Sequence, residues 1–120
     1  MENYLLLALL IKHAIIDIGI QRIQGPRDKQ IYFSLKAHEH YGFHGLGTFI
    51  VFSIMVTPII GLFLGIIDWI CHWHIDYSKS QINMRNNLNQ SHQNYWWLLT
   101  IDQILHYITY WILIYVYRIL

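Results

Sequence analysis

Histidine and aspartate recur at four-residue intervals in four apolar stretches of the chain. Four residues are about one helical turn, so the members of each set would share one face of a helix. Neutral imidazole and ionised carboxylate are common ligands of zinc, iron and manganese, and these residue types therefore predict a metal site. In chain order the sets are His13, Asp17 and Gln21; His40 and His44; Asp68, His72 and Asp76; and Asp102 and His106.

The four sets hold enough ligands for two divalent metal ions, which we expect to be zinc, iron or manganese. An aspartate one turn from a histidine can instead accept a hydrogen bond from the ring nitrogen that does not bind the metal, and so orient the imidazole. Asp17 or Asp68, left uncoordinated, would then act as the general base. The expected ligands are His13, Asp17, His40, His44, Asp68, His72, Asp76, Asp102 and His106.

Three of the eight histidines stand apart from these sets. His38 precedes the second set and is open to two interpretations, a ligand or a loop residue. His74 points away from the face that carries His72, because two residues turn an α-helix by about 200°. His92 lies in a polar segment. We expect neither His74 nor His92 to bind a metal.

The elements that carry these residues are apolar enough to lie in a membrane. Of the 120 residues, 55% are hydrophobic and only 12% are charged, against about 25% charged residues in ordinary soluble domains. Residues 48–67 contain no ionisable side chain, and about 20 such residues suffice to span a bilayer. Pro58 divides this apolar region into two helices, since the residue before a proline resists helix.

We therefore predict a single all-α domain over residues 1–120, a four-helix transmembrane bundle with both termini on the same side. The helices are expected at 3–22, 37–56, 58–78 and 95–117. Polar segments separate the first two and the last two helices, so both segments must face one side. Gly61 and Gly65, four residues apart, are a weak signal of close helix contact.

Six of the eight basic residues lie in or beside these two polar segments. By the positive-inside rule the segments are cytoplasmic and the termini lie outside. All four His/Asp sets then fall in the cytoplasmic half of the bundle. An unpaired ionisable group in a membrane costs about 2.5 to 3.5 kcal/mol, so we expect the sets to satisfy one another.

Several other functions are excluded or left open by the same residues. Cys71 is the only cysteine, so no internal disulfide forms, and a net charge of +1 offers no basic face for nucleic acid. Arg27, Lys29 and Lys79 lie at the mouth of the expected site, where they could hold a phosphate or a lipid head group. The alternative is ordinary positive-inside charge.

The motifs resemble a family of small polytopic inner-membrane proteins of bacteria and their phages, described as a domain of unknown function. The resemblance implies an integral protein of a bacterial or phage-encoded inner membrane, and the pattern is similar to that of membrane-bound metal-dependent hydrolases. The matching residues are His13-x3-Asp17-x3-Gln21, Lys29, either His40 or His44, His72-x3-Asp76-x2-Lys79 and Asp102-Gln103-x2-His106.

Hydrolysis is the favoured chemistry, because the spans lack the Glu-x2-His pairs of helical di-iron proteins. A water activated by the metal would attack a phosphoryl or acyl centre, with a membrane lipid or a phosphorylated lipid as substrate. The alternatives are a di-iron membrane oxidoreductase, a proton or metal-ion carrier, and a non-catalytic membrane interaction protein. The almost purely apolar stretches 49–56 and 107–116 argue against a carrier. A homo-oligomer is compatible with the sequence.

Overall fold

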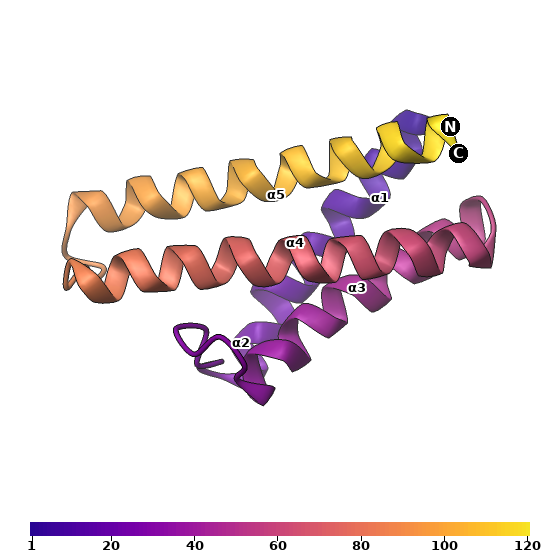
Figure 1. Cartoon of the computed structure of the whole chain (residues 1–120). Helices are drawn as coiled ribbons and strands as arrows, with labels where there is room; N and C mark the ends of the chain where they lie inside the picture. The colour runs from indigo at the N-terminus through magenta and orange to yellow at the C-terminus, as the bar shows by residue number, and fades with distance from the viewer.

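The computed structural model describes all 120 residues as helices, turns and loops, without a strand (Figure 1). The first three elements run on as one continuous helix, so the chain forms four long helices. The predicted all-α class is confirmed. In chain order the elements are α1 (Glu2–Ala14), the π-helical segment η1 (Ile15–Ile20), α2 (Gln21–Gln24), α3 (Leu35–Met55), α4 (Pro58–Arg85) and α5 (Gln93–Ile119).

The break between α3 and α4 lies where the sequence predicts it. Thr57 is extended, and its side chain accepts a hydrogen bond from the backbone N–H of Ile60 at 3.4 Å. Pro58 occupies the first helical position, where its fixed φ suits a helix start and its missing N–H costs nothing. Ser34 caps α3 in the same way, accepting from the backbone N–H of Ala37 at 3.3 Å. Local chemistry thus sets both helix starts.

The third helix is longer than predicted, since α4 continues to Arg85 rather than ending near residue 78. No glycine or proline interrupts the polar residues after Ser78, and the helix ends only where Asn87 takes a positive φ of 51°. Asparagine tolerates that conformation better than most residues. The polar composition of this segment predicted a loop, but polarity alone does not stop a helix.

The four helices form a ring in which each packs against two others: the first against α3 and α5, and α4 against the same two. Both termini lie at one end of the molecule, beside the α3–α4 turn (Figure 1). An ion pair of 3.0 Å joins Arg118 Nε to Glu2 Oε1 across the two termini. The longer connections at 25–34 and 86–92 lie away from that end.

Glycine allows α3 and α4 to approach closely. A Cβ added to Gly65 would lie 2.6 Å from the carbonyl oxygen of Gly45, and one added to Gly45 would lie 2.7 Å from the carbonyl oxygen of Gly65. Neither position leaves room for any other side chain. This close approach brings His40 and His44 of α3 next to His72 of α4.

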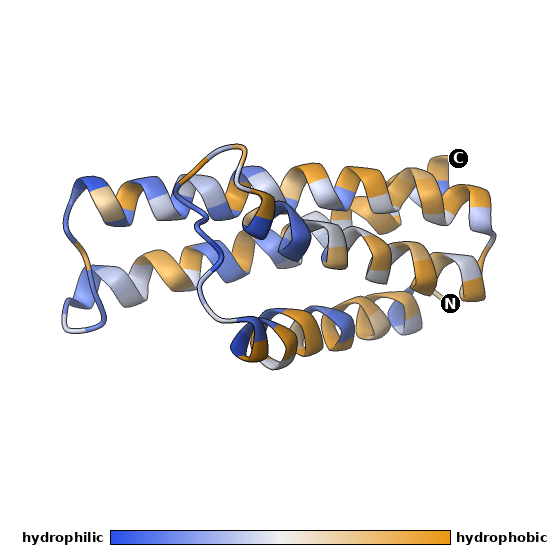
Figure 2. Cartoon of the chain, turned by 90° about the horizontal axis from the view of Figure 1, so that it is seen from below, coloured by the Kyte–Doolittle hydropathy of each residue, from blue (hydrophilic) through white to orange (hydrophobic).

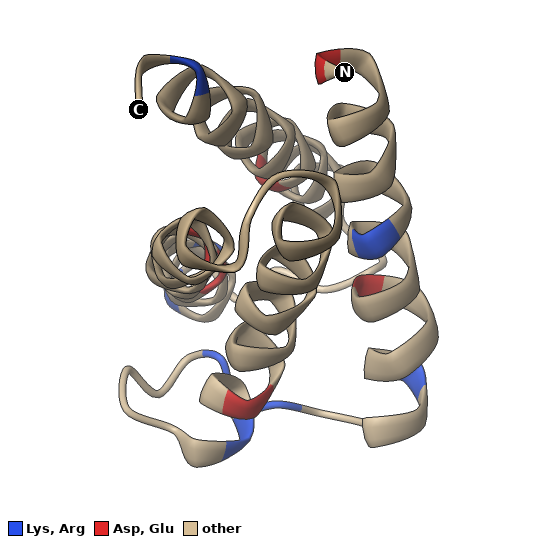
Figure 3. Ribbon diagram, turned by 90° about the vertical axis from the view of Figure 1, so that its right-hand side faces the viewer, with Lys and Arg blue, Asp and Glu red and all other residues tan.

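Three helices are long and apolar enough to cross a membrane: Glu2–Gln24, Pro58–Arg85 and Gln93–Ile119. The termini end of the bundle is mostly hydrophobic, and the hydrophilic residues gather toward the connections (Figure 2). Charged residues are few along the ribbon (Figure 3). Crossing by all four helices stays a prediction.

A buried apolar cluster fills the termini half of the bundle. Its main members come from all four helices, and their side chains are fully buried: Leu5, Leu9, Phe52, Leu64 and Leu113. This packing closes the interior on the termini side of the polar residues. The polar site therefore lies in the other half.

Candidate metal centre

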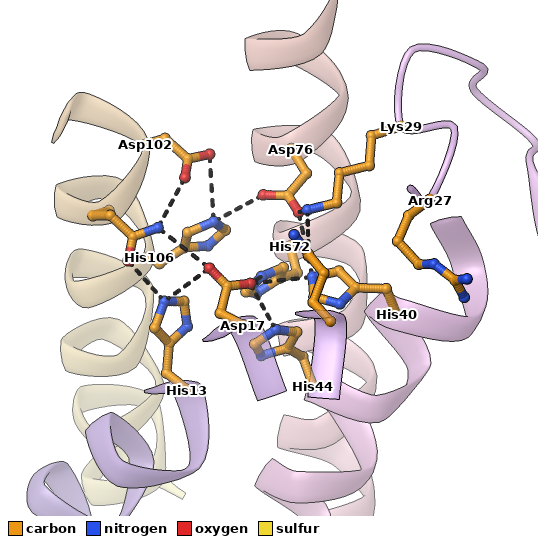
Figure 4. Close-up of polar contacts among 12 residues, drawn as sticks. His13, Asp17, Arg27, Lys29, His40, His44, His72, Asp76, Asp102 and His106 are labelled. Atoms are coloured by element: carbon orange, nitrogen blue, oxygen red, sulfur yellow. Dashed lines mark hydrogen bonds and ion pairs between the residues drawn. The ribbon is translucent and has the colours of Figure 1, made fainter. Parts of the chain in front are cut away.

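Four elements place imidazole and carboxylate groups at one point in the bundle interior (Figure 4). The four-residue spacing directs the side chains of each helix to the same face, as the sequence predicts. Asp17 lies on the π-helical segment η1, and His40 and His44 lie on α3. His72 and Asp76 come from α4, and Asp102 and His106 from α5.

The first group of donors consists of Asp17, His40, His44 and His72, whose ligand atoms all lie within 4.8 Å of one another. All three imidazoles are fully buried. Asp17 Oδ1 lies 3.1 Å from His40 Nε2, 3.2 Å from His44 Nε2 and 3.7 Å from His72 Nε2. Three nitrogens around one carboxylate oxygen form a ligand set suited to tetrahedral zinc.

The second group consists of His72, Asp76 and His106, also within 4.8 Å of one another. His106 Nε2 lies 3.0 Å from Asp76 Oδ1. His72 belongs to both groups, and its ring stacks between those of His44 and His106, with centroid distances of 3.6 and 3.8 Å. Two histidines and one carboxylate form a common site with open coordination positions.

The hydrogen bonding of His72 is unusual for a fully buried side chain. Neither of its ring nitrogens has a hydrogen-bond partner, and His40 Nδ1 has none either. Buried polar atoms are nearly always bonded, and an unprotonated imidazole nitrogen is a metal donor. The donor set and these unpaired nitrogens fit a divalent metal ion.

The aspartates inside the bundle form ion pairs with lysines, except Asp17. The three buried aspartates each contact a lysine, whereas Asp17, whose side chain is 16% exposed, has histidines and Gln103 beside it and no lysine or arginine. A protonated histidine or a metal cation is what remains to balance its charge. The lysine pairs are Lys12 with Asp68 at 2.7 Å, Lys29 with Asp76 at 2.7 Å and Lys79 with Asp102 at 3.3 Å.

Asp68, a predicted ligand and candidate general base, lies outside both groups. Its Oδ2 accepts hydrogen bonds from Lys12 Nζ at 2.7 Å and from Thr48 Oγ1 at 2.6 Å. Lys12 Nζ also donates to the carbonyl oxygen of His44 at 3.2 Å. Asp68 therefore forms a buried ion pair beside the site.

Sequence reasoning missed Lys12, although a signal was available. Lys12 is the only lysine or arginine in the apolar stretch 4–20. An intramembrane cation needs a partner, so an aspartate was to be expected near it. Spacing within one helix could not show which aspartate on another helix would supply that partner.

His13 lies at the edge of the first group rather than in it. Its Nε2 lies 3.5 Å from Asp17 Oδ2 and 3.0 Å from Gln103 Oε1, and its Nδ1 lies 2.7 Å from the hydroxyl of Tyr110. These contacts hold the ring next to Asp17. Tyr110 gave no signal in the sequence, because an aromatic residue in a span is usually a packing residue.

Asp102 flanks the second group. Its Oδ1 lies 3.5 Å from His106 Nε2, and its Oδ2 accepts a hydrogen bond from Gln103 Nε2 at 3.0 Å. A carboxylate in this position orients an imidazole ligand. Asp102 thus matches the alternative arrangement, in which an aspartate one turn from a histidine positions it.

The three basic residues predicted to hold a head group all contact the chain itself. Lys29 Nζ contacts Asp76 and donates to Gln21 Oε1 at 2.9 Å. Arg27 donates to the carbonyl oxygens of Gln24 and Gly25 and lies 3.6 Å from Glu39. Lys79 contacts Asp102. Binding of a head group by these residues stays a prediction.

His38, left open between ligand and loop residue, anchors a loop. Its Nε2 lies 3.3 Å from the carbonyl oxygen of Tyr32, and its Nδ1 accepts from Trp69 Nε1 at 3.3 Å. It belongs to neither donor group, and neither does His74 or His92. The loop that His38 holds in place delivers Lys29 to Asp76.

The π-helical segment was not predicted, and it carries Asp17. Such segments in helices are rare and occur often at functional sites. The helix that positions Asp17 is therefore irregular at the point where it meets the histidines of α3 and α4.

A family described as "Protein of unknown function (DUF3307)" matches residues 5–120. The chain belongs to this family. No curated protein and no solved structure matches the chain. The expected membership of a family of unknown function is confirmed. The family description assigns no reaction, so similarity to membrane-bound hydrolases stays a prediction.

Proposed function

We propose that this protein is an integral membrane metalloenzyme whose divalent metal ion binds to Asp17, His40, His44 and His72. One observation carries the proposal: four donor atoms from three separate helices lie within 4.8 Å of one another. The three imidazoles are fully buried, and no lysine or arginine neutralises Asp17. Burial of so many polar groups without a bound cation would be costly.

Zinc fits the first group best, because three imidazole nitrogens and one carboxylate oxygen match its preferred ligands and number. Iron and manganese are the next candidates. The two donor groups share His72, which supports a dinuclear centre, yet Lys29 Nζ already lies 2.7 Å from Asp76 Oδ2. A second ion at Asp76 and His106 requires this lysine to move away. We propose one resident ion, with a second position controlled by Lys29.

All four helices cross the membrane in this proposal. The helix α3 packs between two helices that are themselves apolar enough to span, so it shares their environment. The basic residues beside the two longer connections support a cytoplasmic location for that end, by the positive-inside rule. The metal site then lies in the cytoplasmic half of the bilayer.

The proposed reaction is hydrolysis of a membrane lipid or a phosphorylated lipid. A bound divalent ion supplies a Lewis acid and makes a neighbouring water molecule more acidic. His13 is the side chain placed to donate a proton to the leaving oxygen, because its Nε2 faces the acceptors Asp17 Oδ2 and Gln103 Oε1 and therefore carries a hydrogen. Asp68 is a poor general base, since Lys12 and Thr48 already bind its Oδ2.

The buried apolar cluster argues against a path for protons or metal ions through the bundle. Its main members are Leu5, Leu9, Phe52, Leu64 and Leu113. These side chains fill the interior between the polar half and the termini end. A carrier would need polar groups or water there. The same argument favours catalysis or binding at one membrane face.

Metal analysis of the purified protein tests the proposal. We expect detergent-purified protein, reconstituted with zinc, manganese or ferrous iron, to keep about one equivalent of metal after desalting, and His40→Ala to lose it. His92→Ala is the matched control, since this histidine lies in the connection before α5. Wild-type protein that stays helical by circular dichroism and holds no stoichiometric metal would refute the proposal.

A further inference from the structure

A groove of about 600 Å³ runs along the outside of the bundle between the first helix and α5. Its walls are mainly apolar and come from two antiparallel helices. They include Leu6, Leu10 and Ile18 on one side and Tyr107, Ile108 and Trp111 on the other. A second groove, of about 360 Å³ between α3 and α4, is lined by glycine, apolar and aromatic residues only.

The first groove differs from the second in its polar floor, which His13 and Gln103 provide. His13 Nε2 lies 3.5 Å from Asp17 Oδ2, and Gln103 Nε2 lies 3.4 Å from the same oxygen. The groove therefore ends one side chain away from the proposed metal ligands. The groove between α3 and α4 has no such connection.

The groove between the first helix and α5 has an apolar end and a polar end. Leu6 and Trp111 lie toward the termini end, whereas Ile18 and Gln103 lie toward the end that carries the longer connections. The apolar end is thus deeper in the membrane, and the polar floor is nearer the cytoplasmic surface. A lipid of the cytoplasmic leaflet has this same order, with its polar group nearest that surface.

What covers the groove follows from the helices that form it. Both Glu2–Gln24 and Gln93–Ile119 are long and apolar enough to cross a membrane. Ile18 and Trp111 on the rims are 71% and 64% exposed. Hydrocarbon chains, rather than water, surround such residues in a bilayer.

We propose that one acyl chain of a membrane phospholipid binds in this groove, with the ester or phosphate oxygens of the lipid beside His13 and Gln103. The inference rests on the proposed function in one respect, because it names the substrate class of that site. The chain packs against Leu10 and Trp111. The lipid oxygens lie at the polar end of the groove, where His13 Nε2 and Gln103 Oε1 hydrogen-bond each other at 3.0 Å. Access is lateral, from the bilayer.

Photolabelling of the full chain tests the inference. The protein is reconstituted into phosphatidylglycerol vesicles that contain phosphatidylglycerol with a diazirine in its acyl chain, and labelled peptides are mapped by mass spectrometry. We expect labels concentrated in residues 6–18 and 103–111. Ala14→Trp fills the groove from an exposed position and should lower that labelling about tenfold, which corresponds to ~1.4 kcal/mol.

Ile108→Trp on the opposite wall provides a second obstruction, should Ala14→Trp fold poorly. Leu46→Trp, in the groove between α3 and α4, is the matched control and should leave the labelling unchanged. Labels spread evenly over all exposed helix faces, or insensitive to both obstructing variants, would overturn the inference. Metal content distinguishes the two proposals: localised labelling on metal-free wild-type protein would refute the metalloenzyme and support the lipid site.

Discussion

Asp17 and Asp68 are aspartates in the same bundle, and the partners around them are of opposite kinds. Asp68 Oδ2 binds the ammonium group of Lys12 at 2.7 Å and the hydroxyl of Thr48 at 2.6 Å. Asp17 Oδ1 faces the ring nitrogens of His40 and His44 instead. A lysine supplies a permanent charge, whereas neutral imidazoles supply lone pairs and require a separate cation.

The two regions adjoin each other. Lys12 Nζ, which neutralises Asp68, lies 3.5 Å from His44 Nδ1 and donates to the carbonyl oxygen of His44. The Asp68 region therefore supports the ring that faces Asp17. The two aspartates therefore differ in role under the proposed function: Asp68 forms an internal ion pair, and Asp17, which contacts no lysine, is the proposed metal ligand.

The largest effect is expected from Asp68→Asn, which leaves the ammonium group of Lys12 buried without its counter-ion. Breaking a buried pair in this way costs about 3 to 5 kcal/mol of unfolding free energy. Unfolding in mixed micelles with increasing sodium dodecyl sulfate measures the loss. The double variant Lys12→Met/Asp68→Leu should recover most of it, because no charge remains unpaired.

We expect that double variant to bind metal as fully as the wild type, which would show that the Lys12–Asp68 ion pair is not needed for metal binding. An Asp68→Asn protein of unchanged stability that has lost its metal would contradict the different roles assigned to the two aspartates. Asp68 would then act as a ligand.

Asp17→Asn should weaken metal binding about a hundredfold, or ~2.7 kcal/mol, because it removes the carboxylate ligand and leaves the three imidazoles. Competition with a chromogenic chelator measures the change in affinity. Asp28→Asn, in the first connection, is the control and should bind metal as the wild type does. Equal metal affinity in the wild type and in Asp17→Asn would show that Asp17, like Asp68, is not a metal ligand.

Lys29→Met tests whether the ion pair with Lys29 keeps Asp76 from binding a metal, as Lys12 does for Asp68. The substitution frees Asp76 Oδ2, to which Lys29 Nζ is bound at 2.7 Å. We expect metal content to rise from about one to about two equivalents, as His72, Asp76 and His106 become able to bind. Lys36→Met, a lysine 64% exposed at the start of α3, is the control. An unchanged content of one equivalent would show that Lys29 does not guard a second position.

Thr48→Val should have the smallest effect, about 1 kcal/mol of stability, because it removes one hydrogen bond to Asp68 and keeps the ion pair with Lys12. The same unfolding measurement detects it. Metal content should not change. A loss as large as that of Asp68→Asn would mean that the hydroxyl, rather than the ammonium group, holds this carboxylate.

Much of the fold could be predicted because its signals are local. Pro58 after an extended Thr57 sets the turn between α3 and α4, and the apolar composition sets the helical class. The far end of α4 was predicted too early, since the polar residues after Ser78 continue the helix in the absence of a breaker. The π-helical segment at Ile15–Ile20 has no local sequence signal of this kind.

The all-helical class, the family and the residue types of the site follow from the amino-acid sequence, because composition and four-residue spacing depend on one helix at a time. The packing of the helices brings Asp17 to His40, His44 and His72, and Asp68 to Lys12. Each aspartate lies four residues from a histidine on its own helix. Their partners come from other helices, and the rotation and axial register between helices depend on packing such as the contact of Gly45 with Gly65.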